Sequence, residues 1–380
     1  MKQYYRPLVL TAATLVAVLL SLVLGGRFPA IDGPLYDLSV ALAAKLRPAP
    51  AEPPQVAIIA LDQRSLAAPE LESVPRVLMA PQWAKLIEAL SADGSKAIGF
   101  DIIFSFSAGG LLPNYDKPFL DALLHHRQQV VLGRSLQTTM ARPFFFALGA
   151  NRDPGSVGFS ELTADSDGVV RHIRPTLPLA NGQAAITLAA AVARRAGASS
   201  MPADAWLVPP GPLEALPTYA LIDVLRCADR DPAKLAKVFA GKVVLVGSTL
   251  PEEDRKRTPD HFLTPPAGDP PPADAAAGCV LAQLPPSAPD AGTVPGVYLQ
   301  ASAVQVLLGE NAAAAVPAPP RALLAGATAL AGGGIGFALA PWLAVAGVVV
   351  LALLLFVGQT AALAAGWWLP VALPAVAGLG

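Results

Sequence analysis

The sequence predicts an α/β domain with a mainly parallel sheet flanked by helices, attached to membrane-spanning helices at both ends. Val56–Leu61 is an apolar run rich in β-branched residues, and Ala97–Phe100 is a second apolar run; both are typical of buried strands. Between them, apolar residues recur at helical spacing over Trp83–Leu90. A strand, a helix and a strand within about fifty residues form a βαβ unit, which pairs its strands in parallel. Apolar stretches at Arg6–Gly25 and from Ala322 onward predict the membrane spans.

Composition limits the class of protein. The chain has 380 residues, of which 53% are hydrophobic and only 14% are charged. These values are too apolar for a soluble protein, while the charged middle does not fit a bundle of spans alone. The formal net charge is −1, so the chain lacks the basic excess of a nucleic-acid-binding protein, and we expect no nucleic-acid partner.

The N-terminal apolar stretch predicts the topology. Arg6–Gly25 has about twenty residues, enough to cross the hydrocarbon core. Lys2 and Arg6 precede it, so the positive-inside rule places Met1 in the cytoplasm and the following domain outside. A cleaved signal peptide is the alternative, but the stretch is long for one and no clean A-x-A site follows. We expect residues 1–26 to form a cytoplasmic stub and the first span.

Residues 27–320 are expected to form the extracytoplasmic domain. It begins with an amphipathic segment, Ile31–Leu46, and continues into the βαβ unit. After that unit, periodicity and apolar runs predict the helix Pro118–His126, the strand Gln129–Leu132, the Ala-rich helix Ile186–Arg195, the short helices Tyr219–Leu225 and Pro232–Phe239, the strand Gly241–Gly247 and the helix Val297–Leu308.

A turn is predicted at Ser166-Asp167-Gly168, with Gly168 supplying a positive φ. This turn favours a hairpin that joins Gly158–Leu162 to Val169–Ile173. The alternative, a calcium loop, requires a glutamate several residues further on, and the sequence has none there.

Residues 267–293 are rich in Pro, Ala and Asp and are expected to be a disordered insertion. The two cysteines, Cys227 and Cys279, form no zinc or redox motif. Outside the cytoplasm they are candidates for a disulfide that tethers the insertion.

No charged residue occurs from Ala322 to the end of the chain, so residues 321–380 are expected to hold three closing spans. Tryptophans at Trp342 and Trp367-Trp368 are expected at the membrane interface. Gly332 and Gly336 have the G-x-x-x-G spacing that allows close helix packing. The spans are predicted over Ala322–Ala340, over Leu343–Gly366 and from Leu369 onward, the last too short to cross, so a continuation beyond Gly380 is expected.

Charged residues near strand ends suggest a ligand site. Asp62 and Asp101 each follow or end an apolar run, and the sequence predicts that they lie at the carboxyl ends of neighbouring strands, where open α/β sheets form their crevice. Charges at such positions are paired or face an open crevice, since burying them unpaired is costly. Ordinary structural ion pairs are the alternative. The candidate ligand-binding residues are Asp62, Arg76, Asp101, Asp167, Arg171 and Asp254.

The order of several short motifs resembles the CHASE2 extracellular sensor domain over about Ile31 to Gly309. The motifs that carry the resemblance are ALDQRSL, PRVLMAPQWAKLIEAL, AIGFDIIFS, SVGFSELTADSDGVVR, FAGKVVLVGST, RTPDHFLTP and PGVYLQASAVQVLLG. The layout of one span, the domain and three closing spans is also similar to that family. The insertion at 267–293 departs from the family pattern, and the output domain typical of the family is not present in the sequence.

The resemblance implies the input part of a bacterial signal-transduction receptor, multi-pass in the inner membrane with its sensor domain periplasmic or extracellular. It implies a cytoplasmic output: an adenylate or guanylate cyclase, a histidine kinase, a diguanylate cyclase or a protein kinase. The expected partners are an unknown small-molecule or envelope ligand, the lipid bilayer and a second copy of the chain. The signal would pass through Ile31–Leu46 and Val297–Leu308, because each leads directly to or from a span.

Two other function classes compete with a receptor. An exported, membrane-anchored hydrolase would use Asp62, Asp101 and Asp167 as metal ligands or acid–base groups. However, no nucleophile–histidine pairing or HExxH-type motif is present, so we expect no catalytic residue, metal or cofactor in this chain. A structural envelope protein is the third class, and it predicts neither a ligand nor a cytoplasmic extension.

Overall fold

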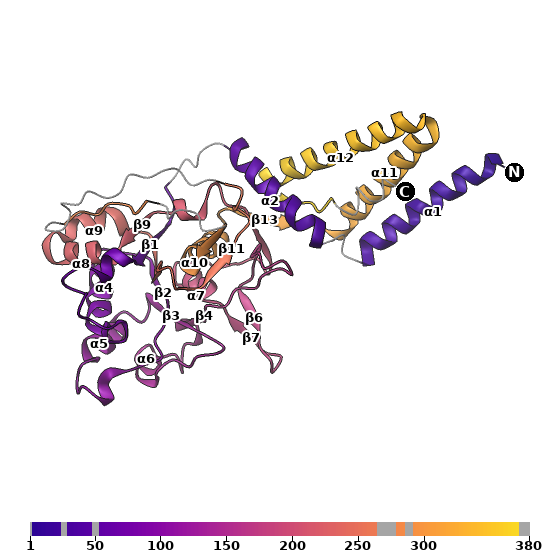
Figure 1. The fold of residues 1–380 in the computed structure, drawn as a ribbon. Coiled ribbons are helices and arrows are strands. Elements are labelled where there is room, and N and C mark those ends of the chain that lie inside the picture. Colours follow the sequence, from indigo (N-terminus) through magenta and orange to yellow (C-terminus); the bar gives the residue numbers. More distant parts are fainter. Residues whose placement is uncertain (1, 24–28, 48–52, 264–278, 286–291, 372–380) are drawn as a thin grey trace.

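The structure is a computed structural model that describes residues 2–23, 29–47, 53–263, 279–285 and 292–371. At its centre lies a six-stranded sheet with the order β4-β3-β2-β10-β1-β9 (Figure 1). All of its pairings are parallel. The strands are β1 (Val56–Leu61), β2 (Ala97–Ile103), β3 (Val130–Arg134), β4 (Val157–Phe159), β9 (Thr218–Ala220) and β10 (Val243–Ser248). The predicted α/β class with a mainly parallel sheet is therefore confirmed.

The predicted adjacency of β1 and β2 is wrong. β10 lies between them, with Val243 in register with Val56 on one side and with Ala97 on the other. β10 is an apolar run whose residues Val243–Gly247 are all buried, so a central place in the sheet satisfies both its faces and its backbone. The βαβ crossover fixes parallel direction and does not require that its two strands be neighbours.

Helices cover both faces of the sheet. One face packs against α3 (Gln63–Leu66), α4 (Ala80–Ala92), α5 (Lys117–His125), α6 (Arg142–Ala147), α8 (Leu221–Arg230) and α9 (Pro232–Phe239). The other face packs against α7 (Leu188–Arg195) and α10 (Gly296–Leu307). α7 lies very close to the sheet because Gly99 and Gly158 have no Cβ: a Cβ at Gly158 would lie 2.5 Å from the Leu188 Cα.

A smaller sheet with the order β14-β13-β8-β5 lies between the main domain and the long helices. Its strands are β5 (His172–Ile173), β8 (Ala205–Leu207), β13 (Ala312–Ala315) and β14 (Trp367–Trp368). Two further strand pairs are antiparallel: β6 (Thr176–Pro178) with β7 (Ala184–Ile186), and β11 (Arg255–Arg257) with β12 (Thr293–Pro295).

The predicted hairpin around Ser166-Asp167-Gly168 is wrong. The turn itself forms, with Gly168 at φ +81° and its N–H donating to the Asp165 carbonyl. However, β4 joins the edge of the main sheet and β5 pairs with β8, so the two flanking segments do not pair. Each segment has its own tertiary strand partner, β3 for the first and β8 for the second, and these pairings outweigh the local pairing that the turn favours.

Two predictions for the later part of the domain need correction. Tyr219 belongs to the edge strand β9, and the helix predicted to begin there starts at Leu221. Within the predicted disordered insertion, residues 279–285 are ordered, and Gln283 forms an isolated bridge with Tyr219. Thr293 belongs to β12, while residues 267–278 and 286–291 lie outside the described part of the chain.

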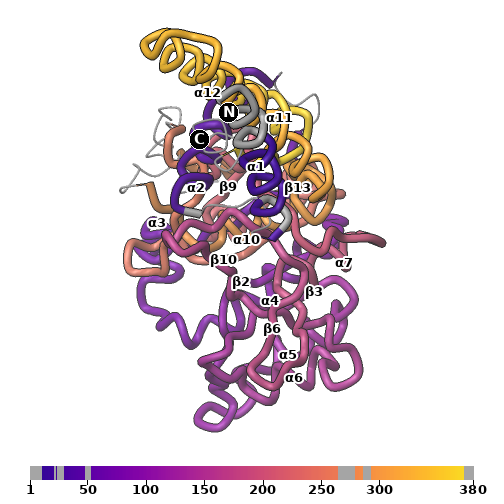
Figure 2. The backbone as a smooth tube through the Cα atoms, turned by 90° about the vertical axis from the view of Figure 1, so that its right-hand side faces the viewer, coloured from indigo at the N-terminus to yellow at the C-terminus, as the bar shows by residue number. Residues whose placement is uncertain are grey.

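The long helices gather at one end of the molecule (Figures 1 and 2). They are α1 (Lys2–Val23), α2 (Pro29–Leu46), α11 (Ala318–Ala338) and α12 (Pro341–Ala364). Within the described residues, α11 and α12 are long and apolar enough to cross a membrane. The apolar segment of α1, Thr11–Leu20, is shorter than the length required for a span. The predicted number of spans is therefore not confirmed.

Trp368 is buried inside the protein, whereas the sequence predicts it at a membrane interface, and its neighbour Trp367 stays exposed. Trp367 and Trp368 form β14, which pairs in parallel with β13, and Trp368 is 1% exposed. Trp368 packs against Tyr36 of α2 and Trp206 of β8. The third predicted span begins at Leu369, but Leu369–Val371 is not helical, and the rest lies beyond the described residues.

Of the predicted G-x-x-x-G pair, Gly332 is buried but Gly336 is open. A Cβ at Gly336 would meet nothing within 4 Å, whereas a Cβ at Gly326 would lie 3.1 Å from the Val18 Cγ2 of α1. α1 and α11 therefore approach each other at Gly326, which lies closer to the N-terminal end of α11 than the predicted pair.

Candidate functional site

A crevice opens at the carboxyl edge of the parallel sheet, with a volume of about 370 Å³. We call it the carboxyl-edge crevice. Asp101 on β2 and Ser248 at the end of β10 form its floor, and the loops after β3 and β4 and the first turns of α10 form its walls. Its lining residues are Asp101, Ile103, Ser135, Gln137, Ser160, Glu161, Leu162, Ser248, Glu253, Asp254, Lys256, Gly296, Val297 and Gln300.

A second, more apolar cavity of about 390 Å³ adjoins this crevice. The two share Asp101, Ile103, Ser248 and Glu253. The second cavity is lined by aromatic side chains that pack against one another, including Trp83, Phe104, Phe119 and Phe144. Asp101 therefore stands between a polar and an aromatic compartment, an arrangement typical of small-molecule sites.

Burial is the main cause that raises the pKa of Asp101 to about 6; a hydrogen bond with the Ser160 side chain opposes the rise, and the nearby carboxylates of Glu253, Asp254 and Glu161 add to it. Within the described residues, no ion pair joins Asp101 to a cation. A carboxyl group with such a pKa, at the floor of a cavity, is a candidate functional group.

Glu161 and Gln300 present fixed acceptor atoms in the crevice. Glu161 Oε1 accepts from the Ser135 hydroxyl at 2.7 Å and from the Leu136 N–H at 2.6 Å, while its Oε2 is buried without a hydrogen-bonding partner in the described structure. Gln300 is 1% exposed, and its Nε2 donates to the Ser160 carbonyl at 2.7 Å. That bond leaves Gln300 Oε1 as a second buried acceptor without a partner among the described residues.

Two of the sequence-predicted residues lie beside Asp101. Asp254 lines the crevice and pairs with Lys256, whose Nζ lies 2.7 Å from its Oδ2. Arg76 lines the aromatic cavity and pairs with Glu253 at 2.7 Å. Asp101, Arg76 and Asp254 thus belong to one continuous region.

Asp62 lies outside that region. It is the N-cap of α3, where its Oδ1 accepts from the Ser65 N–H at 2.9 Å. An aspartate directly before a short helix satisfies otherwise unpaired N–H groups, so its position after β1 has a structural explanation.

Asp167 and Arg171 form a different cluster, under the juxtamembrane helix α2. Arg171 is 1% exposed, and its guanidinium donates two 2.7 Å hydrogen bonds to Asp37 of α2. It also donates to Asp165 at 2.9 Å and to Asp167 at 2.8 Å. We call these four residues the Arg171 cluster. Burial alone would lower the pKa of Arg171, but its bonds to Asp37 and Asp167 raise it, so the guanidinium stays charged.

One short strand connects the crevice with the Arg171 cluster. Lys256 of β11 lines the crevice, and the next residue, Arg257, accepts a 2.9 Å hydrogen bond at its carbonyl from the Val170 N–H. Val170 directly precedes Arg171, which holds Asp37. β11 also pairs with β12, which leads into α10 at Gly296 in the crevice wall.

The helix α2 is bound on its other sides as well. Its Tyr36 hydroxyl donates to the Leu207 carbonyl of β8 at 2.7 Å. Its Ser39 Oγ accepts from Gln359 Nε2 of α12 at 2.8 Å, and Arg47 donates to the Leu363 carbonyl at 2.8 Å. α2 is therefore held between the domain and the end of α12.

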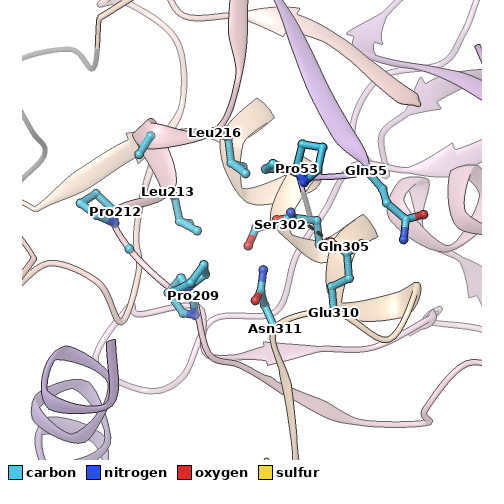
Figure 3. Close-up of a pocket in the computed structure, with 14 residues that line it drawn as sticks. Pro53, Gln55, Pro209, Pro212, Leu213, Leu216, Ser302, Gln305, Glu310 and Asn311 are labelled. Carbon is cyan, nitrogen blue, oxygen red and sulfur yellow. Dashed lines mark hydrogen bonds between the residues drawn. The ribbon is translucent and has the colours of Figure 1, made fainter. Parts of the chain in front are cut away.

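Another cavity, of about 550 Å³, lies at the opposite, amino edge of the sheet. Figure 3 shows Pro209, Pro212 and Leu213 across this cavity from Ser302 and Gln305. Two of its polar side chains are engaged with each other: Gln305 Nε2 donates to Glu310 at 3.3 Å. Prolines and leucines form much of its wall, and none of the sequence-predicted site residues lines it.

Cys227 of α8 and Cys279 are joined in a disulfide that spans 52 residues. It ties the ordered part of the insertion, residues 279–285, to the main domain. Disulfides persist in oxidising compartments and are rare in the cytosol.

Comparison with known proteins decides the family. A family model described as the CHASE2 domain matches residues 12–348. The chain belongs to the CHASE2 family. CHASE2 domains are extracellular sensor domains typical of membrane signalling receptors. No curated protein and no solved structure matches the chain.

Sequence reasoning missed several residues of this CHASE2 domain. Glu161 follows the short strand β4, whose end could have marked it, and Gln300 is a polar residue inside the apolar helix α10. Asp37 is an acid on a mostly apolar helix. Gln300 and Asp37 carry the same signal, a polar residue on an apolar helix, and that signal predicts a buried partner or an open site.

Proposed function

We propose that this CHASE2 chain is the input part of a membrane receptor, with its domain outside the cytoplasm and its signal passed inward through transmembrane helices. Family membership supports a sensor role. The disulfide between Cys227 and Cys279 supports an oxidising, extracytoplasmic compartment. The residues 1–26, 27–320 and 321–380 would then be the first span, the sensor and the closing spans.

The arrangement of the helices supports this topology. α11 leaves the domain and α12 returns to it, so that β14 packs back onto the domain beside β13 (Figure 1). α1 lies alongside α11, with Val18 against Gly326. With Met1 inside, a membrane around these helices places the turn at Leu339 in the cytoplasm and the domain outside.

The observation that carries the proposal is the route from the crevice to the juxtamembrane helix. A ligand can shift a conformational equilibrium only by binding one state better than the other. Lys256 in the crevice wall is one residue from Arg257, which bonds to Val170 beside Arg171, and Arg171 holds α2 through Asp37. A change in the crevice therefore has a short physical path to the helix next to the first span.

The proposed receptor acts in the inner membrane of a bacterium, as a homodimer, and drives a cytoplasmic nucleotide cyclase or kinase. The chain itself would contribute no catalysis and no cofactor. The output and the dimer follow from the usual organisation of the family.

Cysteine labelling tests the topology on the full chain, because both native cysteines are paired and the parent protein has no free thiol. Asn181→Cys places a thiol on the exposed turn between β6 and β7, and Leu339→Cys places one between α11 and α12. In spheroplasts of a bacterial host, a membrane-impermeant maleimide is expected to label Asn181→Cys at once. Leu339→Cys should react only after the membrane is permeabilised.

The unsubstituted protein is the control and should stay unlabelled in both conditions. Protection of Asn181→Cys until permeabilisation would place the domain in the cytoplasm and overturn the proposal.

A further inference from the structure

The carboxyl-edge crevice is dominated by hydrogen-bond acceptors. Asp101, Glu161, Glu253 and Asp254 line it, against a single lysine, Lys256. Glu253 is paired with Arg76 and Asp254 with Lys256. Asp101 and Glu161 have no cationic partner within the described ranges, so two carboxylates in one cavity are left without a counter-charge.

A buried amide gives an independent indication that a ligand binds here. Gln300 is 1% exposed, and its Nε2 is fixed on the Ser160 carbonyl, so its Oε1 is left as an acceptor in the crevice lining. Glu161 is fixed in the same way by Ser135 and Leu136, and its Oε2 is also buried without a partner among the described residues. Buried acceptors of this kind are normally satisfied, and both residues line the crevice, so a donor bound there would satisfy them.

The way the acidic side chains are grouped disfavours a bare metal ion. Within the described residues, no three His, Cys, Asp or Glu side chains are grouped as in a metal site. A ligand with several N–H donors spread along an organic skeleton can reach separate acceptors, which a single ion cannot. The volume of about 370 Å³ leaves room for a molecule of several heavy atoms.

We propose that the carboxyl-edge crevice binds a small organic cation, with an ammonium group at Asp101 and Glu161 and a further N–H donor at Gln300 Oε1. This inference rests on the proposed sensor function and names the class of its ligand. Charge-assisted hydrogen bonds from an ammonium to two carboxylates would supply both affinity and selection against neutral and anionic molecules.

Calorimetry on the full chain in lipid nanodiscs tests this inference with matched probes. The probes are 1,3-diaminopropane, 1,4-diaminobutane and 1,5-diaminopentane, with 1,4-butanediol and succinate as neutral and anionic controls. At least one diamine is expected to bind, while the diol and succinate are not. Asp101→Asn and Glu161→Gln should each weaken diamine binding by about tenfold or more, since a charge-assisted bond contributes about 1.5 kcal/mol or more.

Asp229→Asn, in a surface pair with Lys85, is the matched control variant and should bind like the parent. If the diamine bound Asp101→Asn and the parent with equal affinity, its binding would reflect only attraction to the net charge of the protein. That result would overturn the inference. Binding of succinate or the diol in place of the diamines, or of none of the probes, would overturn it as well. The cysteine labelling that tests the topology involves no ligand. A failure of the ligand inference can therefore be distinguished from a failure of the receptor proposal.

Discussion

At the scale of single residues, the molecule holds two groups of charged side chains with opposite character. In the Arg171 cluster, a buried guanidinium meets three carboxylates and every donor is used. In the carboxyl-edge crevice, Asp101 and Glu161 line a cavity and form no ion pair with a cation among the described residues. The first group is a fully paired structural ion cluster, and the second has the unpaired charges expected of a ligand-binding site.

Asp101→Asn is expected to stabilise the domain in a pH-dependent way. The pKa of Asp101 is raised from 3.8 to about 6 in the folded state, so the protonated form stabilises the fold. That contribution is complete below about pH 4 and is lost as the pH rises through 6. The variant should therefore match the parent at pH 4 and exceed it by about 1 to 3 kcal/mol at pH 7.5, the range allowing for the partial opening of the crevice to solvent.

Urea unfolding at several pH values, followed by tryptophan fluorescence, measures this difference. Asp229→Asn, in an exposed pair with Lys85, serves as the control and should show a small difference at every pH. A constant offset between Asp101→Asn and the parent from pH 4 to 7.5 would contradict the argument.

At the scale of elements, the sequence predicted those whose patterns are local and strong. Val56–Leu61 and Val243–Gly247 are continuous apolar runs, and both are buried strands. What failed depended on tertiary partners: the strand order, since β10 comes from far along the chain, and the hairpin, since its two arms found other sheets. The prediction for Trp368 failed for the same reason. Tyr36 and Trp206, which pack against its ring, are distant in the sequence, so the local pattern indicated an interfacial tryptophan.

The packing of α7 on the sheet supplies a test at this scale. Gly158→Ala is expected to destabilise the domain by about 1 to 3 kcal/mol, because its new Cβ would lie 2.5 Å from the Leu188 Cα and the helix would have to move. Gly110→Ala is the matched control, since a Cβ there meets nothing within 4 Å. Equal unfolding midpoints for the two variants in urea would show that α7 does not rest on Gly158.

At the scale of the whole molecule, a sheet with a crevice at its carboxyl edge is joined to a group of long helices through α2. The sequence predicted only part of the candidate site. Asp101, Arg76 and Asp254 do lie together. Asp167 and Arg171 belong to the Arg171 cluster, and Asp62 caps a helix. Which charges meet is decided by how loops from β3, β4, β10 and α10 converge, and no local pattern encodes that convergence.

The central claim is that the crevice and the juxtamembrane helix are energetically coupled through β11 and Arg171. A double-mutant cycle between Asp101→Asn and Asp37→Asn, read as the free energy of unfolding in nanodiscs at pH 7.5, tests it most directly. Asp165→Asn, at a side chain 28% exposed, is a milder second partner if loss of Asp37 prevents folding. The control cycle pairs Asp101→Asn with Asp229→Asn, outside the proposed route.

Coupling predicts that the effects of Asp101→Asn and Asp37→Asn depart from additivity by about 0.5 to 2 kcal/mol, while the control cycle adds. Additivity within about 0.3 kcal/mol in both cycles would contradict the account, because the crevice would then have no energetic connection to the helix that leads to the membrane.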